Sequence, residues 1–247
     1  MKKVALILVG VLLGAGLIHA QTSPDLNTLV VAKVPLVPGP LLTPAPAHAQ
    51  WTVTSSTVPG IPSPVGGTPQ PSAPVIQTVN KSDHVYQVQT PVPGGLLVRW
   101  NNQFMQATYL PGVSAPQIDI NTGKLNFINF SKTDYPDFAW ITERNYVGVA
   151  QLGTGKALIF KGKVKMLFGG ALPVPLLTLP HSADGKENAI AAVDFLTRKP
   201  LMVQVSNELL TYQFTNQAPN LTLPKDVQNA FALMQKGIQQ SRIVPSG

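Results

Sequence analysis

The sequence contains no cysteine and few charged residues. Without thiols the chain has no disulfide, no thiolate nucleophile and no thiolate-bound zinc or iron–sulfur cluster. Charged residues make up only 12% of the 247 positions, so the formal net charge of +7 reflects a shortage of acids and not a dense basic surface. Nucleic-acid-binding proteins concentrate lysine and arginine on one face or one helix. We therefore expect no nucleic-acid partner.

The densest basic feature is a short alternating run. Lys161, Lys163 and Lys165 occupy every second position and would line one side of a strand. Such a row is typical of a solvated strand face or of a charged edge that discourages aggregation. The alternative is contact with an anionic partner, such as a lipid headgroup or a surface polymer.

Histidine is also scarce, and no catalytic motif is complete. Of the four histidines, only His84 and His181 lie outside the N-terminal part of the chain, too few for a histidine-rich metal site. Residues 153–157 resemble a phosphate-binding loop but lack its first glycine and its final serine or threonine. Residues 181–184 contain His, Ser and Asp in turn-forming order, whereas catalytic triads assemble from separate elements. We expect no enzyme and no cofactor.

Three acids lie close together in the middle of the chain. Asp134 and Asp137 flank a Tyr-Pro pair, and Glu143 follows. A calcium ion requires six to eight oxygen ligands, and this spacing matches no calcium-binding loop. We expect a surface turn here and no metal site.

The first 20 residues have the three parts of a secretory signal peptide. Two lysines precede an apolar run of about 15 residues, and Ala20 supplies a small residue at the expected cleavage point. The alternative is an uncleaved membrane anchor, but a bilayer-spanning helix needs about 20 apolar residues. We expect export to the periplasm or the outside of the cell, with membrane contact only if this segment is retained.

Residues 21–80 differ in composition from the rest of the chain. They hold half of the 24 prolines and only two charged residues. Proline interrupts helices and central strands, so the segment is predicted to be an extended, largely disordered linker or arm. Its apolar residues, including residues 29–37 and Trp51, leave open a short strand or a contact with the domain that follows.

Residues 81–247 are predicted to form one domain of antiparallel β-strands. Short alternating runs are separated by turn sequences, among them residues 91–95, Asn101-Asn102 and residues 153–155. A further hairpin is expected over residues 118–130, a strand over residues 138–142, an edge strand or a loop over residues 172–179, and a polar turn over residues 181–186. About ten short strands without intervening helices predict a mainly β fold, a curved and open antiparallel sheet.

The clearest strand pattern runs from Ala189 to Phe214. With a turn at Asn207-Glu208, Val205 would lie opposite Leu210, and odd positions of the first two strands would share a face with even positions of the third. That face is apolar and the other is mostly polar. The pattern predicts a three-stranded meander with one buried face.

One C-terminal helix is predicted over residues 224–240. Thr222 can cap it, Pro224 suits its first turn, and an apolar stripe runs from Val227 through Phe231 to Ile238. The small Ala189 and Ala191 leave space on the meander. We therefore expect the helix to pack on that sheet or its rim.

The C-terminal third resembles a known superfamily. Its strand ends in Val193-Asp194-Phe195, a Thr-Arg-Lys-Pro turn follows, and two more strands reach Phe214. This order resembles the late strands of the periplasmic lipoprotein-carrier (LolA-like) and anti-sigma-regulator (RseB-like) superfamily. The resemblance implies an open, curved antiparallel sheet that cups a helix or a lipid chain. It assigns no functional residue in this sequence.

Together these features favour an exported, non-enzymatic protein that binds an apolar or amphipathic ligand, lipid or protein, against its sheet. The alternative is a structural component of the cell envelope or surface, tethered by its proline-rich arm. A hydrolase would require His84 or His181 beside an acid in a pocket.

Overall fold

The computed structural model describes residues 24–58, 73–102, 105–120, 130, 133–164, 187–217 and 219–243. The predicted signal peptide, Lys165, and the expected edge strand or loop at 172–179 and turn at 181–186 lie outside these residues, as does most of the expected hairpin after Ile120.

The described residues form one antiparallel sheet of twelve strands and one α-helix. The strands are β1 (Val31–Ala32), β2 (His48–Thr57), β3 (Val75–Ser82), β4 (Val85–Val92), β5 (Gly95–Asn101), β6 (Met105–Tyr109), β7 (Gln117–Ile120), β8 (Tyr146–Leu152), β9 (Gly155–Val164), β10 (Glu187–Asp194), β11 (Pro200–Val205) and β12 (Glu208–Thr215). The helix is α1 (Lys225–Ile243), and three 3-10 turns are η1 (Leu26–Thr28), η2 (Pro136–Phe138) and η3 (Glu143–Asn145).

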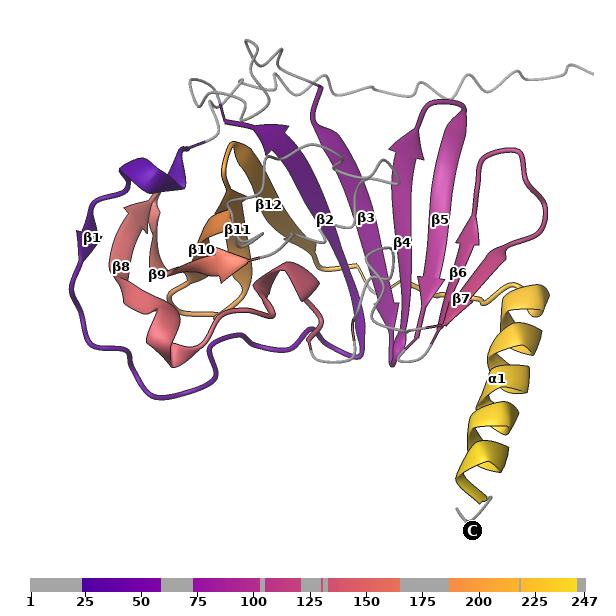
Figure 1. Cartoon of the computed structure of the whole chain (residues 1–247). Helices are drawn as coiled ribbons and strands as arrows, with labels where there is room; N and C mark the ends of the chain where they lie inside the picture. Colours follow the sequence, from indigo (N-terminus) through magenta and orange to yellow (C-terminus); the bar gives the residue numbers. More distant parts are fainter. Residues whose placement is uncertain are drawn as a thin grey trace, which may run out of the picture.

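The sheet is long and not closed. Its strand order is β1-β8-β9-β10-β11-β12-β2-β3-β4-β5-β6-β7, so β1 and β7 are its two edges. Figure 1 shows β8 to β11 curling around one end while β2 to β7 fan out toward the other. The mainly β class and the open, curved sheet predicted from the sequence are confirmed. The strand count is two above the ten expected.

The meander is present, and the predicted sharing of faces holds with a shifted register. The β11–β12 turn is at Ser206-Asn207, where Ser206 has a φ of +51°, and Val205 therefore pairs with Glu208. The predicted turn lay one residue later, which displaces the pairing by two residues. A shift of two keeps every side chain on its face, because side chains alternate with period two.

The core on one side of the sheet, called here the inner face, contains the predicted apolar set. Ala189, Ala191, Val203, Val205 and Leu210 are all buried in it. Trp51 of β2 and Phe160 of β9 join them from neighbouring strands. The meander therefore sits in the middle of a core that runs across much of the sheet.

The opposite, outer face of the meander is not polar as predicted. Ile190, Ala192 and Leu209 are buried there in a second cluster, which Leu26 of η1 covers. Leu201, predicted to lie on the inner face, packs against this outer cluster. Ala192 pairs with Met202 and Val193 with Pro200, so Leu201 is an extra residue in β11, and such a bulge interrupts the alternation of faces there.

The prediction of a disordered arm over residues 21–80 is wrong for β2 and for the part of β3 that lies within it. β2 pairs with β12 and β3 in the middle of the sheet, and Trp51 is 1% exposed. The sequence His48 to Thr57 contains no proline and alternates buried Ala49, Trp51 and Val53 with more exposed residues. The strand was not predicted because the prediction of disorder rested on the proline content of the whole segment, whereas this run has no proline.

The helix exists close to its predicted bounds but does not cover the meander. Val227 is fully buried against Trp100 and Ala107 of β5 and β6, and Phe231 packs beside them. Beyond that contact α1 projects away from the sheet, as Figure 1 shows. No described helix is long and apolar enough to cross a membrane.

Candidate functional site

The segment between β1 and β2, residues 33–47, lies over the inner face and is called the strap here. It contains five prolines and has neither helix nor strand over its length until β2 begins, because proline interrupts both. Leu36, Leu41 and Leu42 pack against the inner core. The strap therefore packs on the inner face, where the sequence had suggested that the helix would lie.

The second wall comes from the chain before β8. The sequence predicted a strand over residues 138–142, but η2 begins at Pro136 and its residues Asp137 and Phe138 turn inward and are buried. Proline at the first helical position is preset for helical backbone angles, which explains the 3-10 turn. Phe138, Tyr135 and Tyr212 meet edge to face, with ring centroids 5.3 Å and 6.3 Å from Tyr212.

A cavity of about 460 Å³ lies between these two walls. Most of its described lining residues are apolar. The lining residues are Leu41, Leu42, Thr43, Pro44, Phe130, Thr133, Asp134, Tyr135, Phe138, Ala139 and Ile141. Polar and apolar atoms contribute almost equally to its surface, and its volume falls within the range typical of small-molecule sites, about 300–1,000 Å³.

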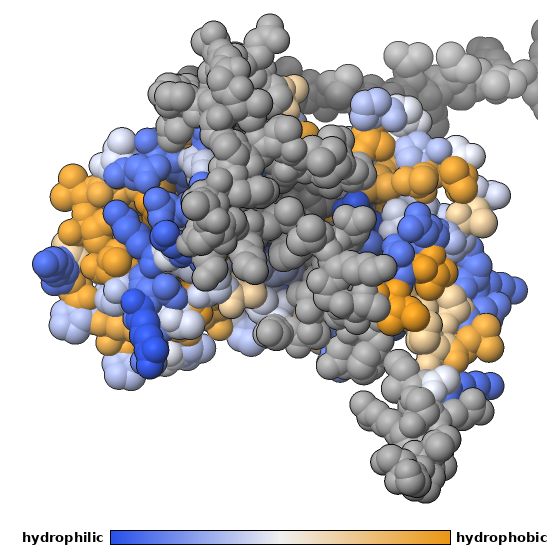
Figure 2. Space-filling view, in the orientation of Figure 1, coloured by the Kyte–Doolittle hydropathy of each residue, from blue (hydrophilic) through white to orange (hydrophobic). Residues whose placement is uncertain are grey.

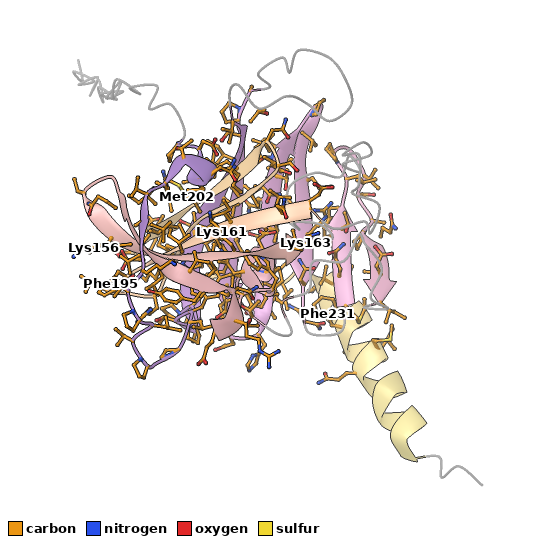
Figure 3. The ribbon with its side chains drawn as sticks, turned by 60° about the vertical axis from the view of Figure 1, so that its left-hand side comes forward. Lys156, Lys161, Lys163, Phe195, Met202 and Phe231 are labelled. Atoms are coloured by element: carbon orange, nitrogen blue, oxygen red, sulfur yellow. The ribbon has the colours of Figure 1, made fainter. Side chains whose placement is uncertain are left out.

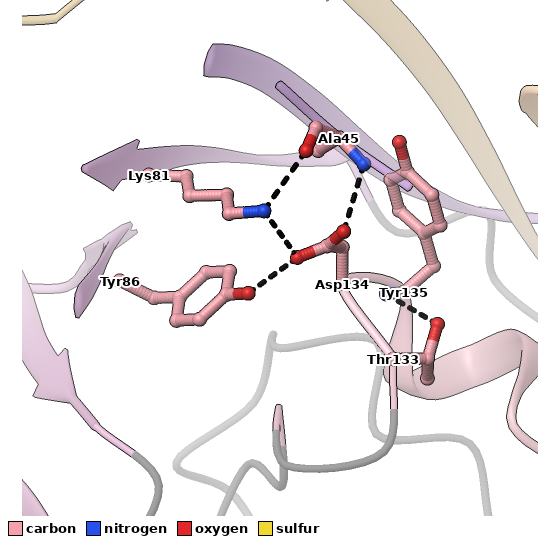
Figure 4. A network of polar contacts seen from close by, with 6 residues as sticks. All are labelled: Ala45, Lys81, Tyr86, Thr133, Asp134 and Tyr135. Carbon is pink, nitrogen blue, oxygen red and sulfur yellow. Dashed lines mark hydrogen bonds and ion pairs between the residues drawn. The ribbon is translucent and has the colours of Figure 1, made fainter. Parts of the chain in front are cut away.

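One charged pair borders the cavity through Asp134, and Figure 4 shows the polar contacts of this pair. Lys81 Nζ of β3 lies 2.7 Å from Asp134 Oδ1, and each side chain is only 10% exposed. The same ammonium donates a hydrogen bond to the Ala45 carbonyl at 2.9 Å, and the Ala45 amide donates to Asp134 Oδ2 at 2.7 Å. The strap is thereby tied through one residue to both members of the ion pair.

Tyr86 completes this network from β4. Its hydroxyl donates to Asp134 Oδ1, and its ring stacks on Phe130 with the centroids 4.0 Å apart. Burial raises the pKa of Tyr86 well above its ordinary value, and the hydrogen bond and negative charge of Asp134 raise it further. The phenol therefore stays protonated and serves as a donor.

A second carboxylate is buried deeper. Asp137 is 4% exposed, and its Oδ2 accepts a hydrogen bond of 2.6 Å from the Tyr212 hydroxyl. Burial raises the pKa of Tyr212 far above its ordinary value, with the Asp137 charge adding to the effect. This pair fixes η2 against β12, and a void of only about 20 Å³ remains beside it.

The polar groups around the cavity already have partners within the chain. Both oxygens of Asp134 already accept hydrogen bonds, and its charge is balanced by Lys81. The Thr133 hydroxyl oxygen accepts from the Tyr135 amide, and the Thr43 hydroxyl donates to the Thr197 carbonyl. A molecule in the cavity would therefore meet apolar side chains and polar groups that are already engaged.

The residues that the sequence offered as candidates for catalysis or metal binding do not come together in one site. His84 is exposed on the turn between β3 and β4, and His181 lies outside the described residues. Gly153 and Thr154 form the turn of the β8–β9 hairpin that the sequence predicted, and residues 155–157 begin β9. Asp134 and Asp137 do not form the expected surface turn, because the buried partners Lys81 and Tyr212 draw them inward.

Lys161 and Lys163, the described members of the alternating run, do not line the cavity. Lys161 and Lys163 are exposed on β9, on the face opposite Phe160, as predicted for a solvated strand face (Figure 3). Within the described part of the chain, no group of three or more metal-ligating side chains comes together.

Sequence reasoning missed Lys81 and Tyr86. The available signal was Lys81 itself, a charged residue two positions from the apolar Val79 and hence on the same face of a strand. A lysine on a buried face requires a partner of opposite charge. Nothing in the local pattern identifies Asp134 as that partner.

Comparisons with known proteins were made at three levels. No family model and no curated protein matches the chain. Among solved structures, the crystal structure of a LolA superfamily protein from Nitrosomonas europaea is similar over 74% of this chain and 91% of that one, with 11% sequence identity and a TM-score of 0.32. At this level of similarity the description of the fold rests on the strand order and register of the chain itself.

Proposed function

We propose that this chain is a non-enzymatic binding protein that holds an apolar or amphipathic ligand in the cavity between the strap and residues 133–141. The single observation that carries the proposal is a cavity of about 460 Å³, lined mostly by apolar residues, whose bordering charges are already paired. The occupant that fits this lining is the hydrocarbon chain of a lipid or of a similar amphiphile. Burial of its methylene groups supplies the binding energy, about 0.8 kcal/mol for each.

The strap explains how such a ligand could enter. It is held by a few polar contacts, at Val34, Thr43 and Ala45, and by partly buried leucines. Segments with few buried contacts open at lower free energy than core strands. The ligand would therefore enter by displacement of the strap while the sheet beneath stays intact.

Export belongs to the same proposal and rests on the pattern of residues 1–20. The tethered envelope component, the alternative at the level of the sequence, required residues 21–80 to be an extended arm. β2 and part of β3 lie within that segment and belong to the sheet, so the binding protein is the function that we pursue.

The test is saturable uptake of a neutral hydrophobic dye, N-phenyl-1-naphthylamine, by the full chain, with displacement by dodecanol. Ala139 is exposed and lines the cavity, so Ala139→Trp should fill it and weaken dye binding at least tenfold without changing the thermal midpoint. Ala232→Trp places the same ring on the exposed face of α1 and should change nothing. Equal binding by both variants, or no saturable uptake, would overturn the proposal.

A further inference from the structure

The turn between β10 and β11 carries two neighbouring cations, Arg198 and Lys199. The guanidinium carbon of Arg198 lies 5.9 Å from the centroid of the Phe195 ring, and Lys199 Nζ lies 5.2 Å from that of Phe214. Both aromatic rings pack against the inner core. The two cations are therefore held on the side of the sheet that contains the cavity.

Arg198 is held in place without a counter-ion. Its Nη1 is buried and has no hydrogen-bond partner, and among the described residues it makes no ion pair. A buried cationic nitrogen without a partner is costly, because transfer of a charge from water requires compensation. Arg198 also has a φ of +57°, a backbone conformation that non-glycine residues rarely adopt.

The nearest acid of the turn does not supply that compensation. Asp194 Oδ1 accepts hydrogen bonds from the Leu196 amide and from the amide and hydroxyl of Thr197. Burial acts to raise the pKa of Asp194, but these hydrogen bonds and the charge of Lys199 outweigh it and lower the pKa. The carboxylate is thus ionised and committed to the turn.

The cations lie next to the cavity wall. The Arg198 carbonyl accepts a hydrogen bond of 3.0 Å from the Thr43 amide, and Thr43 lines the cavity. On the other side, the Phe214 ring below Lys199 meets Tyr135, another lining residue, with the centroids 5.8 Å apart. A molecule with its apolar part in the cavity would therefore need only a short extension to reach this turn.

We propose that Arg198 and Lys199 bind the anionic headgroup, a carboxylate or a phosphate, of an amphiphile whose hydrocarbon chain lies in the cavity. The inference rests on the proposed function and adds the charge class of the ligand. Arginine donates a fork of N–H groups that suits both anions, and Lys199 adds a second positive charge. Arg198 as a whole is partly exposed, so a ligand oxygen can approach the accessible part of its side chain.

The experiment compares three ligands of equal chain length, dodecanoate, dodecanol and dodecylammonium, as competitors of the neutral dye on the full chain at neutral pH. Dodecanoate should bind about tenfold more tightly than dodecanol, and dodecylammonium more weakly than either. In the double variant Arg198→Gln with Lys199→Gln, dodecanoate should lose that advantage while dodecanol binds as before. The matched control, Lys225→Gln with Lys236→Gln, removes two exposed charges from α1 and should leave all three affinities unchanged.

The outcomes separate this inference from the proposed function. Equal affinities for dodecanoate and dodecanol, or an advantage that survives the double variant, would overturn the headgroup site and leave the cavity intact. Binding of neither ligand would overturn both. Inorganic phosphate is the fourth ligand, and if it bound as tightly as dodecanoate, the turn would be a site for a free anion and the inference would be wrong.

Discussion

Lys81 and Asp134 form an ion pair of 2.7 Å in which both side chains are nearly buried, and the backbone of Ala45 bonds to both partners. Three segments distant in the sequence, β3, the strap and the chain before η2, therefore meet at one contact. The pair is both a structural link in the inner core and the closest fixed charge to the cavity.

We predict that Asp134→Asn destabilises the protein by about 3 kcal/mol, because it leaves the Lys81 ammonium buried without a counter-charge. Urea unfolding followed by tryptophan fluorescence measures the change as a lower midpoint. Glu143→Gln removes a carboxylate that is exposed on η3. It should change the free energy of unfolding by less than about 0.5 kcal/mol. Equal midpoints for the two variants would show that the pair contributes little.

The sequence predicted features that depend on local periodicity. Alternation with period two identified the buried face of the meander even though its turn was misplaced by one residue, because the resulting register shift preserves parity. Leu201 was assigned to the wrong face. It is the extra residue of the bulge in β11, opposite Ala192 and Val193, and this bulge has no signature in the sequence. A single irregular residue pair is enough to reverse the face of one side chain.

The cavity could not be predicted, because it depends on contacts between distant segments. The small Ala189 and Ala191 suggested that the helix would pack on the inner face, but the leucines of the strap pack there and the helix contacts Trp100 and Ala107. The strap lies in the proline-rich segment, whose composition suggested disorder. The pairing of Lys81 with Asp134 likewise appears only once the chain is folded.

The turn between β3 and β4 allows a test of backbone strain. Asp83 is exposed and has a φ of +52°, while His84 in the same turn has no positive φ. Glycine adopts positive φ without a steric cost but loses more conformational entropy on folding. Asp83→Gly should therefore stabilise the protein by about 0.5 kcal/mol, and His84→Gly should destabilise it by a similar amount.

Both values are obtained from the same urea titration. Identical effects of the two glycine substitutions would mean that Asp83 is not strained. In that case the turn would differ from the one described here.

We predict that α1 can detach from the sheet while the inner core stays folded. Val227 is fully buried against Trp100, whereas Leu233 is 71% exposed. Val227→Asp places a charge in this contact and should undock the helix at a cost of about 1–3 kcal/mol, with a red shift in tryptophan emission. Aspartate in a first helical turn does not itself weaken a helix, so the effect reports docking.

Leu233→Asp is the matched control and should leave both emission and stability nearly unchanged. Retention of saturable dye binding in Val227→Asp is also expected, because Trp100 and Val227 belong to a cluster separate from the cavity. Loss of dye binding in this variant would show that the helix supports the cavity after all.

The five tyrosines predict how stability depends on alkaline pH. Burial is the main cause that raises the pKa of each tyrosine, and the pKa of Tyr109 rises to about 12. Nearby carboxylates raise the pKa further at four of them, Tyr86, Tyr109, Tyr135 and Tyr212. The folded state thus keeps protons that the unfolded chain releases near pH 10. Stability from these groups is fully present below about pH 10 and is lost as the pH rises through the folded-state values.

Ultraviolet absorbance of tyrosinate should therefore titrate above pH 10 in the native protein and near pH 10 in the urea-unfolded chain. Unfolding free energies measured at several pH values above 10 should fall steeply. Tyr212→Phe removes the fully buried phenol that bonds to Asp137, and should reduce that slope by about 1.4 kcal/mol per pH unit. If the native and unfolded titrations coincided, the hydroxyls would be exposed in the native protein. That result would contradict the burial of Tyr135 and Tyr212 around η2.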